Sequence, residues 1–176
     1  IEHVPELIDA GIDSFKIEGR MKTALYVATV ARTYRKAIDD YMKDPKLYEA
    51  NMEWYKEEIG KCTYREFTTG FYFGKPGSDA QIYNSNTYVK NYTYLGTVEE
   101  ADGKGRCRIE QKNKFSVGET IEIMKPDGRN LEVVVKSICD EDGNEQESAP
   151  HPKQILWVDL GADVDKYDIL RKKEDN

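Results

Sequence analysis

The second half of the chain changes its hydrophobic period to two, and this alternation restricts the fold more than any other feature. Apolar and polar side chains alternate in short segments, as they do in strands with one buried face. Asp-Gly pairs at 102–103, 127–128 and 142–143 fall between several segments at hairpin spacing. Short antiparallel strands in so compact a stretch favour a small closed β-barrel. The predicted strands cover 92–100, 105–111, 120–126, 130–138, 154–160 and 168–172.

Residues 1–60 instead show helical periods around one short strand. A helix is predicted over 2–10, a strand over 12–18, a long helix over 21–42 and a further helix over 46–60. A single strand without a sheet partner leaves its backbone groups unpaired. We therefore expect its partner strands to lie in a longer protein. The start of the chain at Ile1 rather than at a methionine supports the same expectation. A TIM-type barrel of alternating strands and helices is the expected parent.

The helices also predict which side chains are buried. In the long helix, apolar residues recur every three or four positions and predict a buried stripe. The charged residues occupy the remaining face, where simple solvation is favoured over binding. The predicted stripe is Ala24, Val27, Ala28, Ala31, Tyr34, Ile38 and Tyr41, and the charged face is Arg32, Arg35, Lys36, Asp39 and Asp40. The stripe of the following helix is Leu47, Tyr48, Met52, Tyr55 and Ile59.

These patterns divide the chain into three parts and give an α+β fold class. Residues 1–60 are the last βα unit of a truncated TIM-like barrel with one more helix, and 85–176 form the β-barrel domain. Residues 61–84 form an aromatic, turn-rich connector, whose Phe67, Phe71, Tyr72 and Phe73 are expected to pack against a neighbouring domain rather than stack on a ligand. The barrel layout resembles the second domain of translation elongation factors, which is a similarity of fold alone.

Charge and cysteine content limit the function. The net charge of −7 is not that of a protein that holds RNA by bulk electrostatics. Cys62, Cys107 and Cys139 form no C-x-x-C pair, so reduced, partly buried thiols are favoured over ligands of a cluster completed elsewhere. His3 and His151 are isolated, and no metal site is predicted within the chain. The sequence has no long apolar run, and a cytoplasmic location without membrane contact is expected.

Several motifs together resemble one known family. Residues 1–41, with IDSFKIEGRMK at 12–22, resemble the closing segment of the peptidase U32 barrel. The motifs FTTGFYFGKP at 67–76, KFSVGETIEIMKPDG at 114–128, APHPKQ at 149–154 and YDILRK at 167–172 resemble the C-terminal domain of that family. The cysteine-containing signature of the family, which ends in G-x-C-x-[LIVM]-S, is absent from this sequence.

The resemblance implies a parent enzyme of which this chain is an accessory part, inactive when isolated. Relatives with this extension are tRNA uridine 5-hydroxylation proteins that use prephenate, so tRNA is an expected partner, beside the missing N-terminal barrel and a second copy of the chain. An iron–sulfur cluster is implied for the parent and none for this chain. The alternatives are a collagenase-like peptidase with a protein-binding barrel, or a purely structural domain for capping or dimerisation. Peptidase chemistry fits these residues least, because they contain no nucleophile near a histidine and no metal pair.

Residues 16–22, KIEGRMK, are the candidate active-site element. They would follow the last barrel strand, at the rim where catalytic side chains of TIM barrels converge. Glu18 is the candidate general base, and Arg20 the candidate clamp for a carboxylate or phosphate. Lys16, Gly19 and Lys22 are the candidate anion-binding positions near the start of a helix. A structural ion pair between Glu18 and Arg20 is an equally weighted alternative, with the resemblance slightly favouring function.

Overall fold

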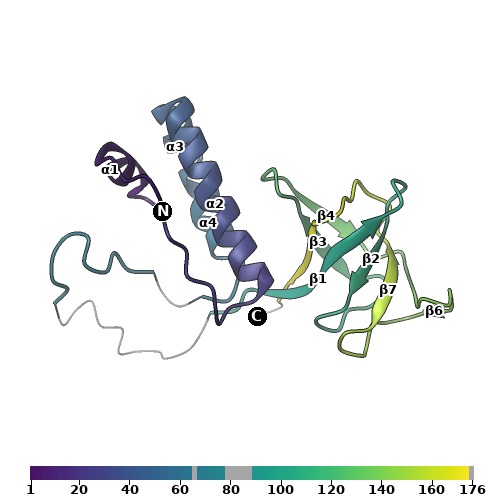
Figure 1. The fold of residues 1–176 in the computed structure, drawn as a ribbon. Helices are drawn as coiled ribbons and strands as arrows, with labels where there is room; N and C mark the ends of the chain where they lie inside the picture. The colour runs from purple at the N-terminus through teal and green to yellow at the C-terminus, as the bar shows by residue number, and fades with distance from the viewer. Residues whose placement is uncertain (65–66, 78–88, 175–176) are drawn as a thin grey trace.

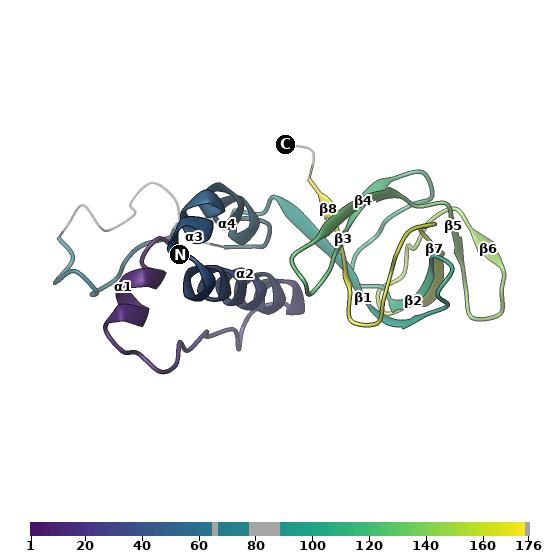
Figure 2. The same ribbon diagram turned by 90° about the horizontal axis from the view of Figure 1, so that it is seen from above.

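The computed structural model describes residues 1–64, 67–77 and 89–174. Its first part contains the helices α1 (Val4–Asp9), α2 (Ala24–Lys43), α3 (Pro45–Ala50) and α4 (Met52–Ile59). Figure 1 shows α2 standing between α1 and the β-sheet domain, and the view from above in Figure 2 places α1 and α4 on opposite sides of α2. Asp44 connects α2 to α3. Its side chain caps the N-terminus of α3 by accepting a hydrogen bond from the Lys46 backbone N–H at 2.9 Å.

The second part is one antiparallel sheet that curls into a barrel. The order of its strands is β4-β3-β8-β1-β2-β7-β5-β6. Ser116 and Ser148 bridge the two ends, where the Ala149 N–H donates to the Phe115 carbonyl at 2.8 Å. The strands are β1 (Tyr92–Ala101), β2 (Arg106–Glu110), β3 (Thr120–Met124), β4 (Asn130–Val134), β5 (Ser137–Cys139), β6 (Glu145–Gln146), β7 (Ile155–Asp159) and β8 (Ile169–Lys173). Strand residues fill the core, among them Leu95, Val98, Ile109, Ile123, Leu156 and Leu170, and Phe115 joins them from the segment before β3.

The predicted α+β fold class is confirmed, with helices followed by an antiparallel, barrel-like sheet. The predicted strand over 130–138 is two strands, because Val135 leaves the ladder with β3 and exchanges backbone hydrogen bonds with Gly118 and Glu119. The predicted helix over 46–60 is interrupted at Asn51, between α3 and α4. Its buried stripe is largely confirmed, since Tyr48, Tyr55 and Ile59 are buried.

The strand predicted over 12–18 is not formed. Residues 12–19 belong to no helix or strand, and Ile12 and Ile17 are exposed. The physical reason is that a strand needs a neighbouring strand to pair its N–H and carbonyl groups. Within the described ranges, no strand lies beside this segment.

The predicted buried stripe of α2 is wrong as the fully buried face, although Ala28, Tyr34, Ile38 and Tyr41 are half-buried against the core. None of its seven residues is buried, and the face that is buried carries Leu25, Thr29, Val30, Arg32, Thr33, Ala37 and Asp40. This face packs inside the chain through hydrogen-bonded polar groups, such as the Tyr55 hydroxyl, which donates to the Asp40 carboxylate at 2.5 Å. The prediction that Arg32 and Asp40 are simply solvated is therefore also wrong, since period alone cannot show that polar side chains have buried partners.

The connector is described only in part, because the predicted domain boundary at residue 85 and the range 78–84 lie outside the described residues. Phe67, Phe71, Tyr72 and Phe73 are all exposed in this chain. Phe73 contacts the His3 ring edge-on, with 4.6 Å between ring centroids. Their packing against another domain stays a prediction. No helix in the described part of the chain is long and apolar enough to cross a membrane.

Candidate functional site

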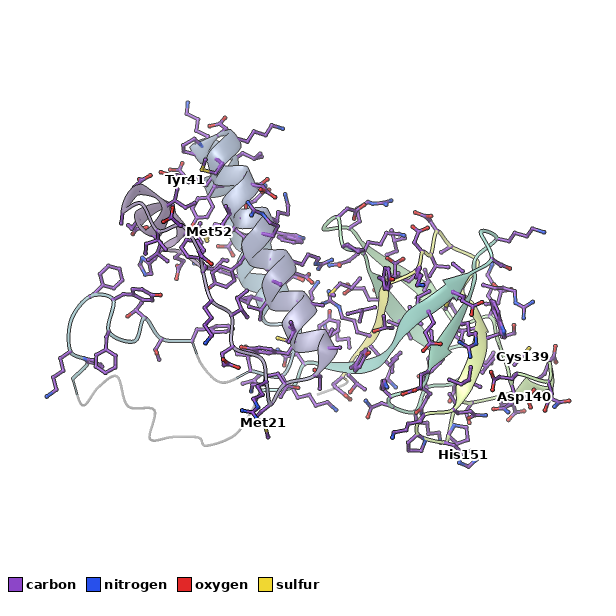
Figure 3. The ribbon with its side chains drawn as sticks, viewed as in Figure 1. Met21, Tyr41, Met52, Cys139, Asp140 and His151 are labelled. Atoms are coloured by element: carbon purple, nitrogen blue, oxygen red, sulfur yellow. The ribbon has the colours of Figure 1, made fainter. Side chains whose placement is uncertain are left out.

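The predicted active-site element, residues 16–22, lies just before the N-terminus of α2. Figure 3 shows Met21 there, at the end of the helix that is near the start of β1, whereas Cys139 and His151 lie at the far end of the barrel. Thr23 caps the helix, and its hydroxyl accepts a hydrogen bond from the Tyr26 N–H at 3.2 Å. Leu25 in the first turn packs against Met124 and Ile169 of the barrel, so the element is held at the junction of the two parts.

The structure does not form the alternative ion pair between Glu18 and Arg20. Among the described residues, the Glu18 carboxylate contacts Lys16 Nζ at 3.7 Å and accepts a hydrogen bond from the Arg20 backbone N–H at 3.3 Å. The side chains of Lys16 and Glu18 are 86% and 70% exposed. Lys22 Nζ lies 5.2 Å from the centre of the Tyr26 ring. The element thus presents Lys16, Glu18 and Arg20 to solvent, and Lys16 is the cation that contacts the Glu18 carboxylate among the described contacts.

Gly19 has a packing reason to be glycine. A Cβ added there would lie 2.5 Å from Val27 Cγ2, closer than side-chain contacts allow. Its carbonyl accepts a hydrogen bond from the Lys22 N–H at 2.9 Å, which closes the turn into α2. The predicted role of Gly19 in approaching a substrate stays a prediction, and its close approach to α2 is the feature that the structure shows.

A second cluster, which sequence reasoning missed, joins the helices to the barrel. We call it the joint, and it consists of Arg32 of α2, Glu58 of α4, Arg171 of β8, Glu122 of β3 and Asn130 of β4. The Glu58 carboxylate accepts hydrogen bonds from Arg171 Nη2 at 2.6 Å and Asn130 Nδ2 at 2.8 Å, and it also pairs with Arg32. Arg171 Nε donates to Glu122 at 2.6 Å.

The joint is buried and electrostatically matched. The side chains of Arg171 and Glu58 are 0% and 1% exposed. Burial alone disfavours the ionised carboxylate, but Arg171 and Arg32 hold the pKa of Glu58 below its ordinary value. Arg32 Nη1 also donates to the Lys125 carbonyl at 2.7 Å and to Asn130 Oδ1 at 3.0 Å. Since each buried charge of this cluster has partners on both the helices and the barrel, the cluster fixes how the barrel sits on the helices.

One sequence signal could have identified Arg171 as a buried member of the joint. The period of two in β8 puts Arg171 on the same face as Ile169, which is a core position. A charged residue at a core position requires a buried partner. Nothing in the helical period distinguished Arg32 or Glu58 from solvated charges, because their partners are far away in the sequence.

The cysteines form no common site. Cys62 is buried between the helices and the barrel, Cys107 is in the barrel core, and Cys139 is partly exposed on β5. Burial raises the pKa of Cys62 to about 11 and that of Cys107 to about 12, so neither thiol is poised as a thiolate ligand. In the described part of the chain, no group of three or more His, Cys, Asp or Glu side chains could hold a metal ion. These residues do not fit an iron–sulfur cluster, and its presence elsewhere in a longer protein stays a prediction.

The motifs and the architecture agree with comparisons to known proteins. The family model for peptidase family U32 matches residues 1–82, and the model for the peptidase family U32 C-terminal domain matches residues 90–171. The two matches follow one another along the chain and cover both of its structural parts. The chain belongs to the peptidase U32 family.

Its relatives carry two kinds of name. The tRNA hydroxylation protein P1 of Bacillus subtilis is 39% identical over 98% of this chain and 41% of its own length. The tRNA hydroxylation protein P of Escherichia coli is 31% identical over 98% of this chain and 37% of its own length. A collagenase of Porphyromonas gingivalis is 37% identical over 62% of this chain and 28% of its own length. The chain thus spans about two fifths of the length of the first two relatives.

Proposed function

We propose that this chain is the substrate-positioning part of a longer enzyme that hydroxylates uridine in tRNA, and that the chain alone is inactive. Two relatives that match almost all of it are named tRNA hydroxylation proteins. The observation that carries the proposal is the joint, because it fixes the barrel to the helix whose first turn follows residues 16–22. A rigid connection is what a domain needs if it holds a substrate at a set distance from reacting groups.

Residues 16–22, just before the N-terminus of α2, suit an anionic, polar substrate. Arg20 offers a planar guanidinium to a phosphate or carboxylate, and Lys16 and Lys22 add positive charge beside the N-terminus of a long helix. Glu18 would act as a base or orient a polar group of the substrate. Its carboxylate already accepts a hydrogen bond from the Arg20 N–H, which limits its orientation.

The exposed face of α2 is the proposed contact with the rest of the longer protein. Ile12, Ile17 and Met42 are exposed, and a cavity of about 600 Å³ lies between the segment 12–17 and α2. The stripe of α2 that was predicted to be buried lines part of it, through Ala31, Tyr34 and Ile38. Missing barrel strands beside residues 12–18 would cover this face and supply the pairing that the segment lacks. A second copy of the chain is the competing occupant, and a cytoplasmic location goes with the proposal.

The second candidate function is a collagenase-like peptidase whose barrel binds protein. The observation in its favour is the similarity to the Porphyromonas gingivalis collagenase. That match covers a smaller share of this chain than the tRNA hydroxylation proteins do. A purely structural capping role remains the third candidate, and it predicts that no residue of 16–22 affects catalysis.

Mass spectrometry of tRNA nucleosides tests the proposal. Deleting the full-length gene should remove 5-hydroxyuridine-type nucleosides, and the intact gene should restore them. The Arg20→Ala variant should restore them poorly, although it folds as the parent does. Unchanged nucleosides in the deletion strain would refute the tRNA role. Equal loss of folding and of activity in the variant would leave Arg20 a structural residue.

A further inference from the structure

A groove runs between α2 and the barrel, beside the joint. Its volume is about 460 Å³, and its floor is apolar, with Ala31 of α2 facing Met124 and Ile169 of the barrel. Figures 1 and 2 show the lower part of α2 facing the side of the barrel that β3 and β8 form. None of the residues considered so far as substrate-binding lines this groove.

Tyr167 stands at its edge in an unusual conformation. The residue has φ of 77°, a left-handed value that is strained for a bulky aromatic residue. Its N–H donates to the Val98 carbonyl at 2.9 Å, so the turn into β8 holds the backbone there. The residue is nevertheless 67% exposed, and Lys166 Nζ lies 5.1 Å from the ring centre. An exposed ring kept at a strained position points to a use for the ring itself.

The charged side chains of the groove are both arginines. Among the described residues, Arg32 and Arg35 line it and no acidic residue does, although the whole chain has a net charge of −7. Arg32 is more than nine-tenths buried, and its Nε–H has no acceptor in the described ranges 1–64, 67–77 and 89–174. In the part of the chain that the structure describes, Arg35 pairs only with Asp39. Both side chains are about 60% exposed, so this ion pair is weak and Arg35 can bind another anion instead. A ligand carrying negative charge would pair with Arg35, whereas the charge of Arg32 is already matched by Glu58 in the joint.

We propose that this groove binds a nucleotide of single-stranded RNA, with the base against Tyr167 and the apolar floor and the phosphate at Arg35. A nucleotide offers a flat base to the Tyr167 ring and the apolar floor and a phosphate to Arg35, neither of which a peptide backbone provides. Stacking on a tyrosine and a guanidinium–phosphate contact are the two elements of single-strand recognition. The inference rests on the proposed function and assigns one point of contact with the RNA.

Fluorescence anisotropy with the full-length protein tests it, using a short labelled oligouridylate and the same backbone with abasic sugars. The oligouridylate should bind about tenfold more tightly than the abasic strand, as one stacked base allows. Tyr167→Gly should abolish this difference while leaving the melting temperature unchanged or raised, because glycine relieves the strained φ. Arg35→Gln should weaken binding of both strands and reduce the slope of log K against log salt by about 0.7. Arg129→Gln is the control, since that arginine is similarly exposed, also pairs with surface aspartates, and does not line the groove.

Equal affinities for the two strands, or wild-type affinity of Tyr167→Gly, would overturn the proposal. Nucleoside analysis separates this failure from failure of the proposed function. If the Tyr167→Gly gene restored tRNA hydroxylation fully while the wild-type protein showed no preference for bases, only the groove assignment would fall. If deletion of the gene left all tRNA nucleosides unchanged, both proposals would fall.

Discussion

Arg171 of the last strand donates to the Glu58 carboxylate at the end of α4 over 2.6 Å, although 113 positions separate the two residues in the chain. Both side chains are excluded from solvent. The contact therefore ties the C-terminal strand of the barrel directly to the helices, and Arg32 and Asn130 complete it from α2 and β4. Each part of the joint comes from a different element, so it forms only when the barrel is docked.

Removing Arg171 should destabilise the chain strongly. Arg171→Met leaves Glu122 and Glu58 with one partner fewer in a buried place, and we expect the free energy of unfolding to fall by about 3–5 kcal/mol. Urea unfolding measures this change. Arg129→Met, which removes an exposed arginine, should change it by less than about 0.5 kcal/mol. A loss below about 1 kcal/mol for Arg171→Met would show that the joint contributes little.

The stability of the joint should depend on pH through Glu58. Because the pKa of Glu58 is lower in the folded chain than its ordinary value of 4.5, its contribution is complete above that pH and is lost as the pH falls through the lowered pKa. Wild type should thus melt well above Glu58→Gln at pH 7, and the difference should shrink below about pH 4.5. Melting curves of both proteins along a pH series test this. A difference that stays constant into strong acid would contradict the assignment.

Gly19→Ala should disturb the turn into α2. The added Cβ would meet Val27 Cγ2 at 2.5 Å, and because Val27 is β-branched it has few rotamers with which to move away. We expect a loss of about 1–3 kcal/mol in stability, typical of overpacking. The double variant Gly19→Ala with Val27→Ala should recover most of it, since Val27 is partly exposed and its truncation costs little. Additive effects of the two substitutions would exclude this contact as the cause.

The three thiols should differ in reactivity. Burial raises the pKa of Cys62 to about 11 and of Cys107 to about 12, whereas Cys139 is partly exposed. A maleimide reagent at neutral pH should therefore label one thiol of the native chain quickly, and all three after unfolding. Cys139→Ser should remove the fast phase. Rapid labelling of Cys62 in that variant would mean that the helices open away from the barrel.

The barrel was predictable because its information is local. Alternation across residues 92–172 and the Asp-Gly turns indicate strands and hairpins from neighbouring residues alone, and the observed strands follow them closely. The end of α4 before Gly60 was also predicted, whereas α2 begins at Ala24 rather than at residue 21 and the helix over 46–60 is divided at Asn51. The strand predicted over 12–18 is not formed, because an extended segment becomes a strand only when another strand pairs with it.

The sequence by itself thus determined the family, the fold class and the residues 16–22 as the candidate active-site element. Only the tertiary structure decided which face of α2 is buried, that Arg32, Glu58 and Arg171 meet, and that Tyr167 stands beside a groove. The physical reason is that period and composition report how one element divides between apolar and polar faces. They do not report which distant group will satisfy a buried charge, and that pairing exists only after the elements have packed together.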